Sequence, residues 1–325
     1  MKNGRGHSFL KVYAKISFMD KRIIFMGSPE FAVPILEGLA ENYHVVGVVT
    51  QPDRPSGRGR VMTPPPVKVK AEQYSLPIMQ PVKLRLPEAF EQLDNWKPDA
   101  IIVAAFGQIL RQNVLDLPPC GCINVHASYL PRWRGAAPIQ AAILSGDEFT
   151  GVSIMRMDAG IDTGPVYKQV KESILPDDTS DTLSSRLSIM GKNTLLEVLP
   201  DILEGKLLPK EQVGDATYVS MMKKEDGILD WTKTAAELER QVRAYNDWPG
   251  AYTLWKDQVL KIRKTCLLDE GKSKPGTHFI SQGIPAVSTA KGSIGLLEVQ
   301  PAGKKWMGGK DFLNGNPDWS RLNGE

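Results

Sequence analysis

The sequence predicts an α/β protein in which a Rossmann-like, doubly wound, mostly parallel sheet is followed by a small antiparallel β-barrel of the OB-like kind. Three observations lead to this fold class. Before about Pro209, short and continuously apolar runs alternate with helical patterns, which is typical of strands buried on both faces of a parallel sheet. After it, apolar and polar residues alternate between frequent turns, as in antiparallel strands. The 325 residues suffice for two domains, at roughly 100–200 residues each.

The first β-α-β unit lies at the start of this pattern. KRIIFMG, residues 21–27, is an apolar run ended by glycine, and HVVGVVT, residues 44–50, is a second run. Between them, Ser28 is expected to cap a helix that has Pro29 at its first position and Glu30 in its first turn. Such a helix start is equally compatible with an anion site and with a helix that is merely well capped.

The remaining elements follow the same alternation. We expect helices over residues 87–93, 136–145 and 178–205, strands over residues 99–107 and 121–126, and a pair of strands around a glycine-rich turn within residues 149–173. The stretch PKEQVGDATYVS, residues 209–220, has no periodicity and is predicted to be a linker. One helix, residues 234–246, precedes the strands of the second domain.

Charge, hydropathy and cysteine content exclude several classes of protein. The formal net charge is +3, and without residues 1–18, which hold four Lys/Arg and no acid, it is −1. A site for a polyanion must therefore be a local basic patch. No apolar run reaches the roughly 20 residues of a membrane helix. Cys120, Cys122 and Cys266 lack C-x-x-C spacing, which favours reduced cytoplasmic thiols over disulfides or a zinc site.

The turn after the first strand carries no dinucleotide fingerprint. GSPEF, residues 27–31, lacks the G-x-G-x-x-G spacing, and no acid ends the second strand. A dinucleotide-dependent dehydrogenase is therefore disfavoured, although the fold class alone would suggest one.

Asn124 and His126 are the first candidate catalytic residues. They lie two apart at the end of a predicted parallel strand, so their side chains point to the same face, at the edge where open α/β sheets bind ligands. An Asn amide can stabilise an oxyanion, and a His can move a proton near neutral pH. The alternative is a half-buried His that is hydrogen-bonded to Asn, but SYLPRWRG, which follows, is hard to explain as core.

The glycine-rich turn MDAGIDTGPV, residues 157–166, supplies a carboxylate. Asp158 and Asp162 are both available, and either could simply form the turn. Asp162 is flanked by two glycines, which makes it the better candidate for a carboxylate held against a ligand. Spacing alone does not establish that it meets His126.

Three segments taken in order, VAAFGQIL, CINVHASYLPRWRGAAPIQ and MDAGIDTGPV, resemble the 10-formyltetrahydrofolate-dependent formyltransferases. The resemblance runs from about Lys21 to LEVQPAGKKWMGGKDFLNG near the C-terminus. QPDRPSGRGR and LPRWRGAAPIQ narrow it to the members that formylate methionyl-initiator tRNA. Ala127 and Tyr129 depart from the family's usual HGSLLPRWRG, which affects the expected folate contacts rather than the chemistry.

The resemblance implies a reaction and a site. The donor is 10-formyltetrahydrofolate, a cosubstrate, and no metal takes part. The amine of methionyl-tRNA attacks the formyl carbon, Asn124 and His126 stabilise the tetrahedral oxyanion, and Asp162 favours the charged imidazole. The residues implied in folate binding are Phe106, Gly107, Gln108, Ile109, Leu110, Ser128, Tyr129, Leu130 and Pro131.

A basic loop is the first candidate for tRNA contact. Residues 51–70 hold five Lys/Arg against one Asp. A charge run of this kind is usually a solvated loop, but this one follows the second strand at the same sheet edge as Asn124. The resemblance implies that Arg54, Arg58 and Arg60 contact the tRNA.

The C-terminal domain offers a second candidate surface. We expect Lys304 and Lys305, with Lys310 nearby, to contact phosphates. Trp306 lies among them in the sequence and is either a platform for base stacking or a packing residue.

The expected organisation follows from these observations. MDKRIIFMGS around Met19 reads as a natural start, so residues 1–18 are expected to be an extension, and the sequence leaves open whether the native protein has it. A formyltransferase catalytic domain (19–208), a linker (209–220) and a tRNA-contacting barrel (221–325) follow. We expect a cytoplasmic monomer without membrane attachment.

Enzymes with other functions have the same kind of first domain. Glycinamide ribonucleotide and amino-sugar-nucleotide formyltransferases and a formyltetrahydrofolate hydrolase are the nearest alternatives, and a tRNA-binding protein without catalysis is another. The separate barrel and the arginine-rich loop favour a macromolecular acceptor, because fold alone does not settle function.

Overall fold

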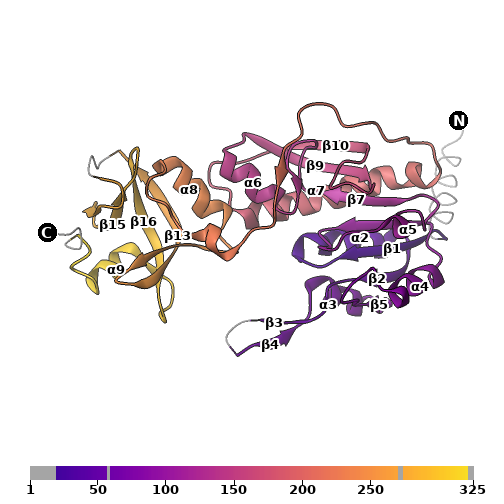
Figure 1. Cartoon of the computed structure of the whole chain (residues 1–325), viewed down its shortest axis with the longest axis horizontal. Coiled ribbons are helices and arrows are strands. Elements are labelled where there is room, and N and C mark those ends of the chain that lie inside the picture. The colour runs from indigo at the N-terminus through magenta and orange to yellow at the C-terminus, as the bar shows by residue number, and fades with distance from the viewer. Residues whose placement is uncertain (1–19, 57–58, 270–273, 321–325) are drawn as a thin grey trace, which may run out of the picture. The chain divides into compact units, whose positions relative to one another are not determined.

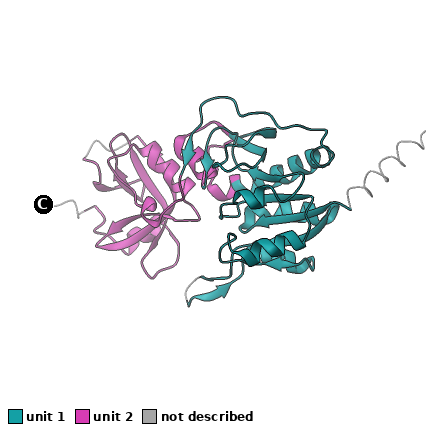
Figure 2. Ribbon diagram, turned by 45° about the vertical axis from the view of Figure 1, so that its right-hand side comes forward, with its two compact units in different colours: residues 1–136, 150–172, 184–219 teal, residues 137–149, 173–183, 220–325 magenta. Residues whose placement is uncertain are grey.

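The computed structural model describes residues 20–56, 59–269 and 274–320, and the chain divides into two compact units (Figure 2). Unit 1 comprises the described residues up to Ala136, with residues 150–172 and 184–219. Unit 2 comprises residues 137–149, 173–183 and the described residues from Ser220 onward. None of the described helices is long and apolar enough to cross a membrane.

Unit 1 contains the mostly parallel sheet that the apolar runs predict (Figure 1). Its strand order over the described residues is β10-β9-β7-β6-β1-β2-β5. The strands are β1 (Arg22–Gly27), β2 (His44–Val49), β5 (Ile78–Met79), β6 (Ala100–Ala104), β7 (Cys122–His126), β9 (Phe149–Arg156) and β10 (Val166–Ser173). All pairs from β5 to β7 are parallel, whereas β9 pairs antiparallel with β7. The predicted fold class is thereby confirmed for this unit.

Helices cover both faces of this sheet. They are α2 (Val33–Asn42), α3 (Pro66–Gln73), α4 (Pro87–Asn95), α5 (Gln112–Leu115) and α7 (Ser180–Leu203). On one face, Leu93 of α4 shares a core cluster with Ile24 of β1. On the other, Gly191 of α7 lies so close to β7 that a Cβ atom there would be 2.7 Å from Val125. Strands covered on both faces read as continuous apolar runs, which explains the sequence pattern.

The chain leaves β1 differently from the expected capped helix. A 3-10 turn, Glu30–Ala32, precedes α2, and no side chain caps it. The Ser28 hydroxyl instead accepts a hydrogen bond from the backbone N–H of Gln51 (3.1 Å). The prediction of Ser28 as a helix N-cap is wrong, because its side chain ties the end of β1 to the residues after β2.

Unit 2 contains an antiparallel sheet. Its strand order over the described residues is β12-β13-β16-β15-β14, with β17 paired to β16. The strands are β12 (Ala251–Trp255), β13 (Gln258–Leu268), β14 (His278–Ser281), β15 (Ile284–Ser288), β16 (Ser293–Pro301) and β17 (Met307–Gly308). The rings of Trp255 on β12 and His278 on β14 are 5.3 Å apart, and both contact Trp319. The two ends of the strand order therefore meet around an aromatic core, as in a small barrel.

Three α-helices lie wholly within the described residues of unit 2. They are α6 (Pro138–Ser145), α8 (Ala235–Ala244) and α9 (Gly309–Asn314). Thr234 caps α8, since its hydroxyl accepts from the Glu237 backbone N–H while the Glu237 carboxylate accepts from the Thr234 N–H. This reciprocal pair satisfies two of the free N–H groups at the helix start.

The segment predicted to be a linker packs along unit 1. Lys210 exchanges two backbone hydrogen bonds with Val166 (2.7 and 2.8 Å), and β11 (Tyr218–Val219) pairs in parallel with β8 (Arg134–Gly135). We call residues 210–219 the strap. Its sequence does not reveal this packing, because the contacts are made by backbone atoms and single polar side chains rather than by a repeated apolar face.

Candidate active site

Strand β7 positions the first two candidate residues. It lies between β6, with which it pairs in parallel, and β9. Asn124 and His126 end it, and their side chains are buried, at 8% and 6% exposure. They share a face because side chains two apart on a strand do. This is the carboxyl edge of the parallel sheet, where α/β proteins bind ligands.

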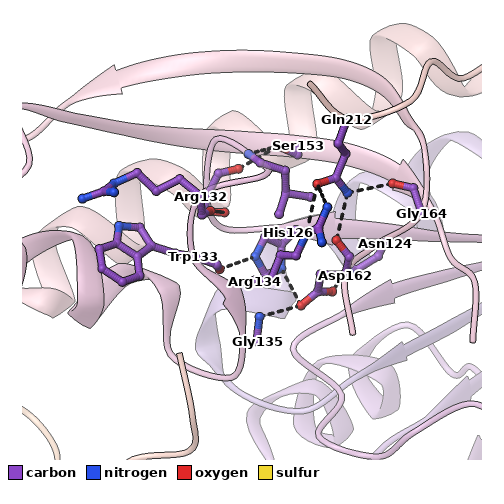
Figure 3. A network of polar contacts seen from close by, with 12 residues as sticks. Asn124, His126, Arg132, Trp133, Arg134, Gly135, Ser153, Asp162, Gly164 and Gln212 are labelled. Carbon is purple, nitrogen blue, oxygen red and sulfur yellow. Dashed lines mark hydrogen bonds and ion pairs between the residues drawn. The ribbon is translucent and has the colours of Figure 1, made fainter. Parts of the chain in front are cut away.

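The surroundings of His126 fix its tautomer (Figure 3). Its Nε2 lies 3.0 Å from the backbone oxygen of Trp133. A carbonyl oxygen only accepts, so Nε2 carries the hydrogen. The other ring nitrogen, Nδ1, faces the carboxylate oxygen Oδ2 of Asp162 at 3.6 Å. Nδ1 is therefore the ring nitrogen that carries no hydrogen in the neutral ring, and it is the one that faces Asp162.

Asp162 meets both residues of β7. Its Oδ1 accepts a hydrogen bond from the Asn124 amide (3.2 Å), and its Oδ2 accepts one from the Gly135 backbone N–H (2.8 Å). Asp162 itself has φ = +51°, the left-handed region that a non-glycine residue adopts only when its surroundings hold it. The structure thus brings together the three residues that the sequence singles out.

Asp158 has the turn-forming role that was the alternative for both aspartates. Its Oδ1 accepts hydrogen bonds from the Gly160 backbone N–H (3.0 Å) and from the Thr163 hydroxyl (2.7 Å). These bonds close the turn that carries Asp162. Asp158 is therefore a local structural residue, and Asp162 is the carboxylate that faces the histidine.

The loop after β7 is held by residues that the sequence did not single out. The Ser153 hydroxyl donates to Ser128 O (2.7 Å) and accepts from Leu130 N (3.1 Å), and Gln169 Nε2 donates to Leu130 O (2.8 Å). Ser128 and Leu130 are buried, whereas Tyr129 and Pro131 are half-buried. Of the four residues predicted to bind folate in this loop, Tyr129 and Pro131 are thus the more accessible.

The second group of residues predicted to bind folate, residues 106–110, follows β6, and we call it the wall after β6. Phe106 and Leu110 belong to the core of unit 1. The Gln108 side chain accepts from Leu84 N (2.7 Å) and donates to Pro81 O (3.1 Å). Gly107, at φ = +79°, and Ile109, at 81% exposure, face solvent. The most exposed parts of this wall are therefore one glycine backbone and one aliphatic side chain, with Gln108 half-buried between them.

Two of the candidate tRNA residues of unit 1, Arg54 and Arg60, lie on a hairpin formed by β3 (Arg54–Ser56) and β4 (Val61–Thr63). Figure 1 shows the hairpin projecting from the body of the unit. Arg54 is exposed and donates to the Gln51 side chain (3.0 Å), and Arg60 is exposed at the turn. Arg58 lies outside the described residues.

The candidate tRNA residues of unit 2 are exposed lysines beside a packed tryptophan. Lys304, Lys305 and Lys310 are exposed. Trp306 is half-buried, and the guanidinium of Arg263 lies 4.8 Å from its ring centre. One face of the Trp306 ring is therefore covered by a cation from β13.

The described residues hold no cluster of metal ligands, and Cys122 on β7 is not a reactive thiol. They contain no group of three or more His, Cys, Asp or Glu side chains arranged to hold a metal ion. Cys122 is buried in the core of unit 1, and this burial raises the pKa of its thiol to about 12. Its thiol therefore stays protonated, and so unreactive, at neutral pH.

Comparisons with known proteins identify the family of the chain. A family model described as formyl transferase matches residues 21–199, and a second, described as formyl transferase, C-terminal domain, matches residues 221–317. The N-formyltransferase from Helicobacter canadensis, solved with folinic acid and dTDP-3-aminofucose, superposes with a TM-score of 0.62 at 18% identity, over 86% of this chain and 99% of that one. The two family models, on a fold of this kind, therefore define a formyltransferase.

Relatives of known name show to which family of formyltransferases the chain belongs. The methionyl-tRNA formyltransferase of Geotalea daltonii is 48% identical over 298 residues, which are 90% of this chain and 95% of the relative. That of Bacillus pumilus is 48% identical over 300 residues, 90% and 94% of the two chains. The chain belongs to the methionyl-tRNA formyltransferase family.

Proposed function

We propose that the protein transfers the formyl group of 10-formyltetrahydrofolate to the α-amine of methionyl-initiator tRNA, giving N-formylmethionyl-tRNA. The observation that carries this proposal is the meeting of Asn124, His126 and Asp162 at the carboxyl edge of the sheet, in a chain that matches both formyltransferase domains. The relatives' printed names support the acceptor, and the folinic acid in the Helicobacter structure supports a folate donor.

The residues around the site suit a folate. The wall after β6 exposes the Gly107 backbone and the Ile109 side chain, which we assign to contact with the pterin ring. The loop after β7 presents the half-buried Tyr129, an aromatic ring that can stack on a planar group. These two walls follow neighbouring strands, so a donor bound between them lies beside Asn124.

Asn124 and His126 supply the groups for the developing negative charge. As the amine nitrogen bonds to the formyl carbon, the formyl oxygen becomes an oxyanion. One N–H of the Asn124 amide donates to Asp162, and the second has no partner among the described residues, which leaves it for the oxyanion. A protonated Nδ1 of His126 is the second donor. It is 3.6 Å from Asp162, longer than a hydrogen bond, so a substrate atom can take its proton.

Protons balance through His126. The attacking amine loses one proton, and the folate nitrogen gains one when its bond to the formyl carbon breaks. The protonated Nδ1 of His126 gives its proton to the folate nitrogen as that bond breaks, and the neutral Nδ1 then takes the proton that the amine loses, so the imidazole ends as it began. The nearby Asp162 carboxylate stabilises the charged imidazole before and after this exchange. The Nε2–H bond to Trp133 O keeps Nδ1 directed at the site throughout.

We assign the tRNA contacts to exposed arginine and lysine side chains of the two units. Arg54 and Arg60 lie on the projecting β3–β4 hairpin of unit 1, and Arg58 belongs to the same loop in sequence. Lys304 and Lys305 are exposed in unit 2. Cations at exposed positions bind phosphates in a salt-dependent way, because binding releases counterions.

An acceptor panel tests the proposed function. Purified protein with 10-formyltetrahydrofolate would be given methionyl-initiator tRNA, glycinamide ribonucleotide, an amino-sugar nucleotide or no acceptor. We expect formylated product only with the tRNA. Formylation of a small amine, or folate hydrolysis without an acceptor, would contradict the proposed acceptor.

A further inference from the structure

The strap reaches the active site through one side chain, Gln212 (Figure 3). Its Nε2 donates hydrogen bonds to the backbone oxygens of Asp162 and Gly164, each at 2.8 Å. One of these carbonyls belongs to Asp162 itself and the other to the residue two positions later, with Thr163 between them. Gln212 thus holds the turn at the point where Asp162 adopts its left-handed backbone conformation, φ = +51°.

The other end of the Gln212 amide is also occupied. Its Oε1 accepts from Arg134 Nε (3.2 Å) and Nη2 (2.9 Å). Arg134 Nη1 donates in turn to the hydroxyl of Tyr218, which is on the strap as well (2.8 Å). A guanidinium only donates and a carbonyl only accepts, so this pattern permits a single orientation of the amide. Gln212 therefore connects the Asp162 turn to Arg134 with fixed geometry.

A second strap residue, Thr217, holds the backbone of Trp133, whose oxygen accepts the hydrogen bond of the catalytic histidine. The Thr217 hydroxyl accepts from Trp133 N (2.8 Å), and Thr217 O accepts from Arg134 N (2.9 Å). Trp133 O is the acceptor for His126 Nε2–H. The strap thus holds the surroundings of the His126–Asp162 pair at two points. Gln212 binds the turn that carries Asp162, and Thr217 binds the Trp133 backbone, to which His126 is hydrogen-bonded.

We propose that Gln212 is a positioning residue that sets the orientation of Asp162 toward His126 and Asn124. The proposal rests on the proposed function, in which these three residues are catalytic. Gln212 touches backbone atoms of the Asp162 turn rather than any reacting atom, so its loss slows chemistry and leaves substrate binding unchanged. A residue in a plain linker would have no such effect.

Gln212→Glu is the sharpest test. A glutamate at this position still accepts both hydrogen bonds of Arg134, now with charge assistance, but donates nothing to Asp162 O and Gly164 O. We expect kcat to fall about 10- to 100-fold, the scale of a misplacement of about 1 Å. KM for tRNA and for folate should stay near wild-type values, and the melting temperature should fall by only a few degrees because the Arg134 contact is kept. Glu211→Gln, an exposed neighbour on the strap, is the matched control and should retain full activity.

Two results would overturn the proposal. One is a Gln212→Glu variant with kcat within twofold of wild type. The other is a loss expressed as a higher KM for tRNA at unchanged kcat, which would make the strap an acceptor-binding element. Gln212→Leu, which loses both halves of the contact, should lower kcat at least as far as Gln212→Glu.

A readout independent of catalysis separates this proposal from the proposed function. The imidazole ¹⁵N resonances of His126 report its contacts with Trp133 O and Asp162. We expect them to shift in Gln212→Glu and not in Glu211→Gln. If the acceptor panel fails but these resonances shift, the positioning role stands and the assigned acceptor is wrong. Unshifted resonances would refute the positioning role whatever the acceptor.

Discussion

His278 makes the stability of unit 2 depend on pH. Burial between aromatic rings lowers its pKa from 6.5 to about 4, and its ring stacks on Trp319 at 4.3 Å. Between these two pH values the unfolded chain binds a proton that the folded chain does not. Stability is therefore complete above about pH 6.5 and falls as the pH drops toward 4.

The size of the effect follows from the shift. One pKa unit corresponds to about 1.4 kcal/mol, so the full shift corresponds to about 3 kcal/mol. The ring is only half-buried, and solvent screening reduces this figure. We therefore expect about 2 kcal/mol to be lost between pH 7 and pH 4, of which about 1 kcal/mol is lost by pH 5.

Hydrogen exchange can isolate this loss. Exchange protection of peptides covering β14 to β16 gives the opening free energy of this sheet at pH 7 and at pH 5, after correction for intrinsic rates. His278→Phe keeps an aromatic ring and removes the titration, so the wild type should lose about 1 kcal/mol more than the variant over this interval. Equal losses in the two proteins would refute the assignment to His278.

Three further predictions concern the site and the tRNA surface. Asp162→Asn should lower kcat by about 10²-fold or more, whereas Asp158→Asn, in the turn, should stay within a few-fold of wild type; similar losses would contradict their separate roles. Gly135→Ala should cost at least about 1 kcal/mol in thermal unfolding, since φ is +115° and its Cβ would lie 2.1 Å from Val219 O; an unchanged melting temperature would count against the strap pairing. Arg60→Ala should raise KM for tRNA but not for folate, and reduce the salt slope of tRNA binding by about 1; equal effects on both KM values would remove it from the tRNA surface.

The sequence predicted those features that local pattern determines. Continuous apolar runs indicated strands buried on both faces, and Leu93 and Gly191 show the helices that cover them. The two-residue spacing of Asn124 and His126 placed them on one face because strand side chains alternate. These inferences need no knowledge of distant contacts.

Features that depend on tertiary contacts escaped sequence reasoning. Ser28 has the residue type of an N-cap, but the segment that follows the neighbouring strand β2 offers its hydroxyl the backbone N–H of Gln51, and that bond forms instead. The strap lacks periodicity because single side chains such as Gln212 and Thr217 make its contacts. The positions of Ser153 and Gln169 beneath the loop after β7 likewise follow from the pairing of strands distant in sequence.

The most direct test of the central claim is the single-turnover rate of formyl transfer in His126→Ala, with both substrates saturating. His44→Ala, which removes an exposed histidine at the start of β2, serves as the control. We predict that the rate falls by about 10²- to 10⁴-fold in His126→Ala, while the Kd values for methionyl-tRNA and folate remain within about threefold of wild type, and that His44→Ala is unchanged. A His126→Ala protein with the wild-type rate, or one that loses substrate binding in parallel with rate, would contradict the assignment of His126 as the residue that carries the proton.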